Sequence, residues 1–254
     1  MNEYQTIQPH KQLKIALIGD NCIDEYQYGT VDRLSPEAPV PVFKDQYIET
    51  KPGMAANVKA NLEALGCEVT AYLGIPSVKT RIIDIRSNQH IVRIDQDRES
   101  EPLTLAECNF DDYDAVVISD YNKGFVTYEL VEQIIQTTSL PIFVDTKKTD
   151  LARFEGAVVK INSSENGSAK TFPTELIVTM GKHGARYQGV TYDARPIEVV
   201  DVCGAGDTFL AALVYGYLKE GTMPIAIAFA IQASAVTVQH MGVYAPTLEE
   251  IVCV

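Results

Sequence analysis

Short runs of apolar residues, each ending in a polar residue or a glycine, recur along the chain at residues 14–20, 115–120, 141–145, 157–162 and 175–181. Each run has the length and the near-continuous hydrophobicity of a strand that is buried on both faces. Helical patterns separate several of these runs, at residues 55–65 and 128–136. Buried strands that alternate with helices predict an α/β fold, with a mostly parallel sheet covered by helices on both faces.

Four polar side chains stand where predicted strands end: Asp20, Asp120, Asp145 and Asn162. The carboxyl ends of parallel strands share one edge of a sheet, and α/β proteins bind their ligands outside that edge. We therefore expect a ligand site at this edge.

Two regions interrupt the alternation. Residues 26–50 are rich in proline and in short β-like pieces, and residues 81–95 alternate polar and apolar side chains in the manner of a β-hairpin. Strands that cannot join a parallel sheet indicate a small β lid over the active-site edge, from about residues 24–50 and 80–97. No repeat or linker divides the sequence, so we expect a single domain across residues 1–254.

Composition narrows the class of protein. The chain has 254 residues, of which 46% are hydrophobic, and its net charge of −13 argues against nucleic acid or an anionic membrane as a partner. The five cysteines include no C-x-x-C pair and do not cluster with the four histidines, so no zinc site or disulfide framework is indicated. The polar start and the short first apolar run argue against a signal peptide or a membrane span. We expect a cytoplasmic protein.

The stretch Gly204-Ala205-Gly206-Asp207 is the strongest candidate for a catalytic site in the sequence. It precedes an apolar-periodic run at residues 209–218, so it marks the start of a helix. Unpaired N–H groups and the positive end of that helix favour a phosphate at the three residues before Asp207. A carboxylate beside that phosphate repels it, but it can take a proton from an attacking hydroxyl, as a kinase requires. The alternative is a tight strand-to-helix turn. No P-loop is present, and Phe209 fills the third glycine position of G-x-G-x-x-G.

Two segments at strand ends are candidates for the part of the site that binds the nucleotide. Asn162 and Glu165 follow a strand, where Glu165 can orient waters around Mg²⁺ or can complete a helix capping box. Both interpretations can hold together. Thr179, Gly181 and Gly184 either leave room for a nucleotide beside a strand end or form a hairpin turn.

The part of the site that binds the acceptor sugar, here called the acceptor side, is expected near the first helix. Asp24 and Asn57, with Gly53 between them, can hydrogen-bond sugar hydroxyls, or they can be a turn residue and an exposed helix residue. Arg81 and Arg93 belong to the predicted hairpin. In so acidic a chain, a local basic group is what a phosphorylated substrate needs, although most such charges are solvated.

The stretch Asp201-Val-Cys-Gly-Ala-Gly-Asp207 fits the pattern D-x-x-G-A-G-D, and the chain resembles the ribokinase-like (PfkB) carbohydrate kinase family. The closer resemblance is to the kinase module of the bacterial ADP-heptose synthesis enzymes, which phosphorylate D-glycero-D-manno-heptose 7-phosphate at the anomeric position. Four segments carry it, and the proline-rich second one is the most specific: residues 19–26, 33–42, 86–95 and 119–124.

The resemblance implies a ribokinase-like three-layer αβα sandwich and the ATP-dependent phosphorylation of a sugar or sugar phosphate. Asp207 matches the family's catalytic base, and Gly204, Ala205 and Gly206 match its anion hole. Asn162 and Glu165 match the motif associated with Mg²⁺ and phosphate. The sugar-contacting positions match Asp24, Gly53 and Asn57, with Arg93 in the acceptor-side lid. A requirement for a monovalent cation stays open.

The chain also departs from the family pattern. Met54 stands where relatives have a second glycine, and a helix-strand unit is absent between Leu73 and Lys79. A second shortening follows Glu165. Two alternatives therefore remain: another kinase of the family, acting on fructose, ribose or a nucleoside, or a shortened relative that binds a ligand without catalysis. Exposed lid edges also predict a homodimer through residues 28–50.

Overall fold

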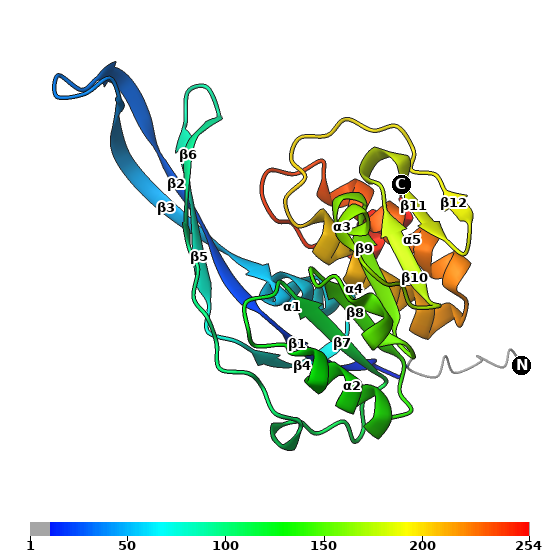
Figure 1. Ribbon diagram of the computed structural model, residues 1–254. Helices are drawn as coiled ribbons and strands as arrows, with labels where there is room; N and C mark the ends of the chain where they lie inside the picture. Colours follow the sequence, from blue (N-terminus) through cyan, green and yellow to red (C-terminus); the bar gives the residue numbers. More distant parts are fainter. Residues whose placement is uncertain (1–10, 254) are drawn as a thin grey trace, which may run out of the picture.

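In the computed structural model, which describes residues 11–253, an eight-stranded sheet lies between two layers of helices (Figure 1). The strand order is β12-β11-β10-β9-β8-β7-β1-β4, parallel from β10 to β4, with β11 and β12 antiparallel. This confirms the predicted α/β fold with a mostly parallel sheet. The strands are β1 (Lys14–Gly19), β4 (Glu68–Leu73), β7 (Ala115–Asp120), β8 (Ile142–Thr146), β9 (Val158–Asn162), β10 (Leu176–Thr179), β11 (Ala185–Tyr187) and β12 (Val190–Tyr192). Most of the polar start lies outside the described residues.

Alternate residues of the central strands pack against the helices on the two faces of the sheet. Ile15 and Leu17 of β1 belong to the core under α1, α4 and α5, whereas Ala16 and Ile18 belong to the core under α2. All four are fully buried. A strand that packs on both faces must be apolar at every position, which is why these runs are continuous in the sequence. The helices are α1 (Ala55–Ala64), α2 (Tyr128–Thr137), α3 (Ser163–Ser168), α4 (Ala205–Glu220), α5 (Met223–Thr237) and α6 (Leu248–Val252), with short 3-10 turns η1 (Leu105–Glu107), η2 (Leu151–Phe154) and η3 (Gly181–His183).

Helix α5 is the largest element that the sequence patterns do not predict. Its residues are apolar on nearly every side, so no helical period stands out. The helix packs closely on α4, where a Cβ on Gly216 would lie 3.1 Å from the Cα of Ala226. Burial against α4 and the sheet, rather than an amphipathic pattern, therefore accounts for this helix.

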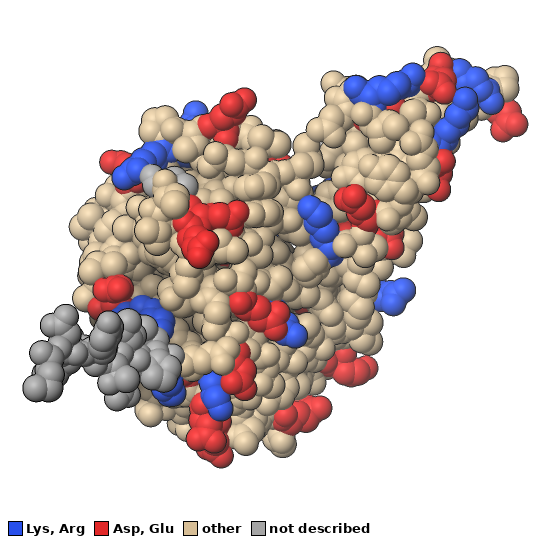
Figure 2. Space-filling view, turned by 180° about the vertical axis from the view of Figure 1, so that it is seen from behind, with Lys and Arg blue, Asp and Glu red and all other residues tan. Residues whose placement is uncertain are grey.

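The lid is a second sheet of four strands in the order β3-β2-β5-β6. Its strands are β2 (Asn21–Leu34), β3 (Pro41–Met54), β5 (Ser77–Asp84) and β6 (Gln89–Gln96). Antiparallel pairing of β2 with β3 runs from their base to the tip, and the pair projects as a long arm beside the body (Figure 1). The lid strands thus begin closer to the body than the bounds expected from the sequence. Basic and acidic side chains alternate over the body on the face shown in Figure 2.

Two connections are short. Strand β4 ends at Leu73 and β5 begins at Ser77, so three residues link the main sheet to the lid. Helix α3 has only six residues before the chain returns to β10. These are the two places where the sequence lacks segments of the resembling family. Both shortenings lie beside the expected ligand edge.

Candidate active site

Asp207 lies in the first turn of α4 and is 4% exposed. Its Oδ2 accepts a hydrogen bond from Asn57 Nδ2 at 2.8 Å, and its Oδ1 accepts one from the Tyr121 hydroxyl at 2.9 Å. Burial raises the pKa of Asp207 from its ordinary 3.8 to about 6, a rise that the two hydrogen bonds and the nearby Lys160 partly oppose. A carboxylate with such a pKa can hold and release a proton near neutral pH.

Asn57 is fixed by a buried network rather than left exposed on α1. Asn61 Nδ2 donates to Oδ1 of Asn57 at 3.2 Å and to its carbonyl oxygen at 2.8 Å. Thr208, next to Asp207, donates to Asn61 at 2.8 Å. Because its oxygen already accepts from Asn61, Asn57 turns its N–H groups toward Asp207. The alternative that Asn57 is an exposed helix residue is wrong, since only 2% of it is exposed.

The glycines before Asp207 form the start of α4. Gly204 precedes the helix with φ +74°, a conformation that favours glycine. A Cβ at Gly204 would stand 2.7 Å from Asn57 Nδ2 and 3.0 Å from Val243 Cγ1. Asp201 binds the backbone N–H groups of Cys203 and Gly242 at 3.0 and 2.9 Å, which holds the two neighbouring loops together. The first turn of α4 lies beside the carboxylate, and the N–H of Ala205 donates to the carbonyl oxygen of Val202 at 3.3 Å. The anion-hole role of residues 204–206 stays a prediction.

Lys160 and Asp145 form a buried ion pair next to these glycines. Lys160 Nζ lies 2.6 Å from Asp145 Oδ2 and also donates to the carbonyl oxygen of Gly206 at 3.3 Å. Burial raises the pKa of Asp145, and the positive charge of Lys160 opposes that rise. The pair ties the ends of β8 and β9 to the first turn of α4.

Asn162 and Glu165 form the capping box of α3. Asn162 accepts from the Glu165 N–H at 2.9 Å, and Glu165 Oε2 accepts from the Asn162 N–H at 2.7 Å. Glu165 Oε1 also receives Lys147 Nζ at 2.6 Å. The capping interpretation is confirmed, and the carboxylate keeps lone pairs for a water.

The segment from Thr179 to Gly184 is a hairpin connection. Strand β10 pairs antiparallel with β11 through η3, where Gly181 and Gly184 have φ of +55° and +79°. A Cβ on Gly184 would collide with the carbonyl oxygen of Tyr192. The hairpin interpretation is confirmed, and its position at the carboxyl end of β10 leaves the nucleotide role as a prediction.

The expected acceptor side contains a buried ion pair. Asp24 is 6% exposed within β2, so it does not start a turn, and its Oδ1 lies 2.5 Å from Arg81 Nη1. Gly53 lies against it: a Cβ there would stand 3.1 Å from Asp24 Cγ. The side chain of Arg93 is paired with Asp95 at 2.6 Å and about half exposed, opposite Arg81 in the lid. The structure therefore brings Asp24, Gly53 and Arg81 together, with Arg93 on the outer strand.

Met54 adopts a backbone conformation that suits glycine. Its φ of 54° and ψ of −132° precede the first turn of α1, and the residue is 4% exposed. A non-glycine residue in such a region stores of the order of 1–3 kcal/mol of strain. The glycine that the resembling family places here is explained by this conformation.

The sequence alone does not identify three residues as neighbours of Asp207 in the site: Tyr121, Asp145 and Lys160. Asp145 stands out there only as a strand end, and Tyr121 lies in a segment notable only for its family resemblance. Lys160 sits inside an apolar run, where a single lysine is the available signal. A lysine in a buried strand needs a partner, and that partner is Asp145.

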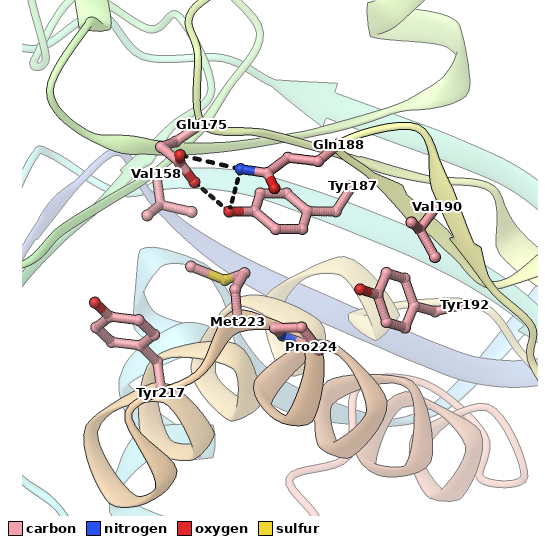
Figure 3. Close-up of a pocket in the computed structure, with 9 residues that line it drawn as sticks. All are labelled: Val158, Glu175, Tyr187, Gln188, Val190, Tyr192, Tyr217, Met223 and Pro224. Atoms are coloured by element: carbon pink, nitrogen blue, oxygen red, sulfur yellow. Dashed lines mark hydrogen bonds between the residues drawn. The ribbon is translucent and has the colours of Figure 1, made fainter.

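A separate pocket of about 620 Å³ lies at the opposite edge of the sheet (Figure 3). It is lined by Val158 at the start of β9, Met223 at the start of α5 and Tyr217 near the end of α4. Tyr217 follows Asp207 by ten residues on α4, which is about 15 Å along the helix axis. None of the candidate site residues lines this pocket.

Comparison with known proteins defines the class. Residues 127–250 match the model of the pfkB family carbohydrate kinases. The matched segment, just under half of the chain, contains Asp207 and helix α4, and it resembles a pfkB-family carbohydrate kinase domain.

The curated relatives narrow the comparison within this class. The chain is 35% identical to the bifunctional protein HldE of a Nitratiruptor species, over 94% of this chain and 64% of the relative. It is 30% identical to the protein of the same name from Shewanella sediminis, over 91% of this chain and 61% of the relative. The chain thus spans less than two thirds of the length of these relatives. The alignment with the Nitratiruptor protein spans 302 positions, whereas this chain has 254 residues. This chain therefore lacks internal segments that the relative has, as predicted from the sequence.

Solved structures support the same fold. Ribokinase from Thermotoga maritima superposes with a TM-score of 0.71 at 15% identity, covering 95% of this chain and 98% of that one. Ribokinase of Arabidopsis thaliana, solved with ribose and ATP, gives a TM-score of 0.69 at 14% identity, with the same coverage. The predicted ribokinase-like sandwich is confirmed.

Within residues 11–253, no helix combines the length and the hydrophobicity needed to cross a bilayer. In the same part of the chain, no three His, Cys, Asp or Glu side chains gather as a metal cage.

Proposed function

We propose that this chain transfers the γ-phosphoryl group of ATP to the anomeric hydroxyl of D-glycero-D-manno-heptose 7-phosphate. The observation that carries the kinase chemistry is the Asp207 carboxylate, held by two hydrogen bonds at the N-terminus of α4 beside Gly204 and Gly206. The heptose assignment rests on the lid segment at residues 33–42 and on the relatives named HldE.

In the proposed reaction Asp207 accepts the proton of the attacking sugar hydroxyl. The bond from that oxygen to the γ-phosphorus forms while the bond from the phosphorus to the β,γ-bridging oxygen breaks, and ADP leaves. The N–H groups at residues 204–206 hold the oxygens of the transferring group, which carry the negative charge. Most of the acceleration comes from positioning and from these preorganised charges.

The residues around Glu165 fit Mg²⁺ as a cofactor. Mg²⁺ keeps several waters and needs only one or two protein carboxylates besides substrate phosphates. Glu165 offers a carboxylate beside the proposed phosphate path and can orient such a water. When bound, Mg²⁺ would neutralise charge on the phosphate oxygens. The fold offers no comparable observation for a monovalent cation, and that requirement stays open.

Basic side chains around the proposed acceptor side support a phosphorylated sugar. Lys147 and Lys79 place their ammonium groups 4.9 and 5.8 Å from the ring centre of Tyr121. Lys79 makes no ion pair with any residue in the described part of the chain, whereas Arg81 is paired with Asp24 and Lys147 with Glu165. In a chain with a net charge of −13, such a local cluster favours phosphate groups.

A coupled ADP-release assay over a panel of sugars tests the proposal. ATP with heptose 7-phosphate should give ADP, and phosphorus NMR should show a new anomeric phosphate. Release with fructose, ribose or a nucleoside, and none with heptose 7-phosphate, would favour another kinase of the family. Saturable ligand binding without ADP from any sugar would instead favour a non-catalytic relative. A cytoplasmic location is part of the proposal, since all five cysteines are free thiols.

The pH profile should show one acidic limb near pH 6. Asp207 must be ionised to accept a proton, and its pKa is about 6 in the free protein. Below that value the ionised fraction falls tenfold per pH unit, so log kcat/KM should fall with a slope of about one. Rates measured across the range from weakly acidic to weakly basic pH check this. A limb about two pH units lower, near the ordinary pKa of an aspartate, would mean that another group is the base.

A homodimer through the lid is also part of the proposal. The lid strands expose large apolar side chains that the body does not cover, among them Leu34, Tyr47, Ile48, Val92 and Ile94. Light scattering at micromolar concentration should give twice the mass of 28.0 kDa. Ile48→Glu should yield monomers, because it would bury a charge in the interface. Ile225→Glu, at an equally exposed position on α5, should leave the dimer intact. A wild-type monomer would contradict this prediction.

A further inference from the structure

The Tyr121 hydroxyl occupies an oxygen that the proposed reaction needs. Oδ1 of Asp207 receives Tyr121, and Oδ2 receives Asn57. A general base must come within hydrogen-bond distance of the proton that it accepts. Each oxygen can accept a second hydrogen bond, but Asp207 is only 4% exposed, so the sugar hydroxyl gains room where one of the two donors moves aside.

Tyr121 and Asn57 are held in different ways. The amide of Asn57 is fixed by Asn61 and cannot turn without breaking that bond. The Tyr121 hydroxyl makes no other hydrogen bond to any residue between 11 and 253. Its backbone N–H is anchored, however, by Asp20 Oδ2 at 2.7 Å. Moving the Tyr121 hydroxyl away from Asp207 therefore breaks a single hydrogen bond of its side chain, while its backbone stays anchored.

The surroundings keep the Tyr121 hydroxyl protonated. Burial, followed by the charge of Asp207, raises its pKa well above the ordinary value. The hydroxyl therefore donates to Asp207 across the working pH range. A donor to a carboxylate favours its ionised form.

We propose that Tyr121 is a positioning residue that holds the base Asp207 until the acceptor hydroxyl of the sugar takes its place. This inference rests on the proposed kinase function. While Tyr121 is in place, its hydroxyl takes the position on Oδ1 that a water would otherwise fill. Without it, a water can transfer its proton to Asp207 as its oxygen bonds to the γ-phosphorus, giving ADP and inorganic phosphate. Tyr121 thus suppresses ATP hydrolysis in the absence of sugar.

Tyr121→Phe tests the inference, because it removes the hydroxyl and keeps the ring and its contacts with Lys79 and Lys147. Tyr187→Phe is the matched control: its hydroxyl also donates to a carboxylate, that of Glu175, but at the pocket on the far edge of the sheet (Figure 3). A hydrogen bond to a charged group corresponds to roughly a ten- to hundredfold effect. We therefore expect ADP release from ATP alone to rise by at least about tenfold in Tyr121→Phe and to stay unchanged in the control.

A second measurement does not need turnover. The carboxyl of Asp207 should titrate at higher pH in Tyr121→Phe, as followed by carbon-13 NMR. Asn57 and Lys160 still favour its ionised form and Asp145 opposes it, so only one stabilising contact is lost. The acidic limb of kcat/KM should move in the same direction, while KM for ATP is unchanged.

Several outcomes would overturn the inference. One is an unchanged Asp207 titration in Tyr121→Phe, and another is equal ADP release from ATP alone in the two variants. A uniform loss of activity that follows a lower unfolding temperature would mean a structural role only. Failure of the wild-type protein to phosphorylate any sugar would refute the proposed function instead, and the NMR titration would still decide whether Tyr121 holds Asp207.

Discussion

Asp207→Asn is expected to lower kcat by about 10²- to 10⁴-fold while leaving ATP binding intact. The substitution keeps the size of the side chain and removes its ability to accept a proton. The anion hole is built from backbone N–H groups at residues 204–206, which the change does not alter. Coupled ADP release measures the turnover, and calorimetry with ATP measures the binding.

Although Asp207→Asn should lose turnover, it should become more stable relative to the wild type as the pH rises. In the folded protein the pKa of Asp207 is about 6, above its ordinary 3.8. Such a group contributes stability at low pH, and this contribution is lost as the pH rises through 6. The shift corresponds to roughly 3 kcal/mol. Asparagine does not titrate, so Asp207→Asn should gain about that much unfolding free energy relative to the wild type as the pH rises from below 3.8 to well above 6.

Asp114→Asn is the control for turnover and for ATP binding. Asp114 caps the opposite edge of the sheet, where it pairs with Lys11 at 2.7 Å and accepts the N–H of Lys14 at 2.8 Å. This variant should keep full turnover. An Asp207→Asn protein within about tenfold of wild-type kcat would mean that Asp207 is not the base.

The elements that the sequence predicts best are those whose pattern follows from local geometry. The continuous apolar strands mark burial on both faces, and Gly204 marks a helix start in a conformation that only glycine adopts easily. Asp207 could therefore be selected before the fold was known. Helix α5 could not, because its apolar character has no period and depends on packing against α4.

The partners of the candidate base depend on topology, which a linear pattern does not contain. Tyr121 reaches Asp207 across 86 positions of sequence, and Asn57 reaches it across 150. Neighbouring strands β1 and β7 are separated by the whole lid, so the loop after β7 meets α4 only in the folded chain. The pairing of Asp24 with Arg81 likewise depends on β2 lying parallel to β5. The sequence shows which residues could form such contacts, but predicting the contacts themselves requires the order of the strands in the sheets.

Gly204→Ala is expected to lower kcat by about 10²- to 10³-fold, the effect of disrupting an oxyanion hole. Gly204 has φ +74°, and the added Cβ would press on Asn57 Nδ2 at 2.7 Å and on Val243 Cγ1 at 3.0 Å. The methyl group therefore pushes against the amide that holds Asp207 and against the side chain of Val243. Base and anion hole would lose their alignment together.

Gly221→Ala at the other end of α4 separates strain from chemistry. Gly221 has φ +69°, nearly the same as Gly204, but nothing lies within 4 Å of its added Cβ. Both variants should lose at least about 1–2 kcal/mol of unfolding free energy, because both force alanine into the left-handed region. Gly204→Ala should lose more than this, because its Cβ also presses on Asn57 and Val243. Only Gly204→Ala should lose turnover, since only its Cβ contacts the site. Urea unfolding and coupled ADP release on both proteins check this. Equal losses of kcat in the two variants would mean that the helix as a whole, and not the contact of Gly204 with Asn57, sets the rate.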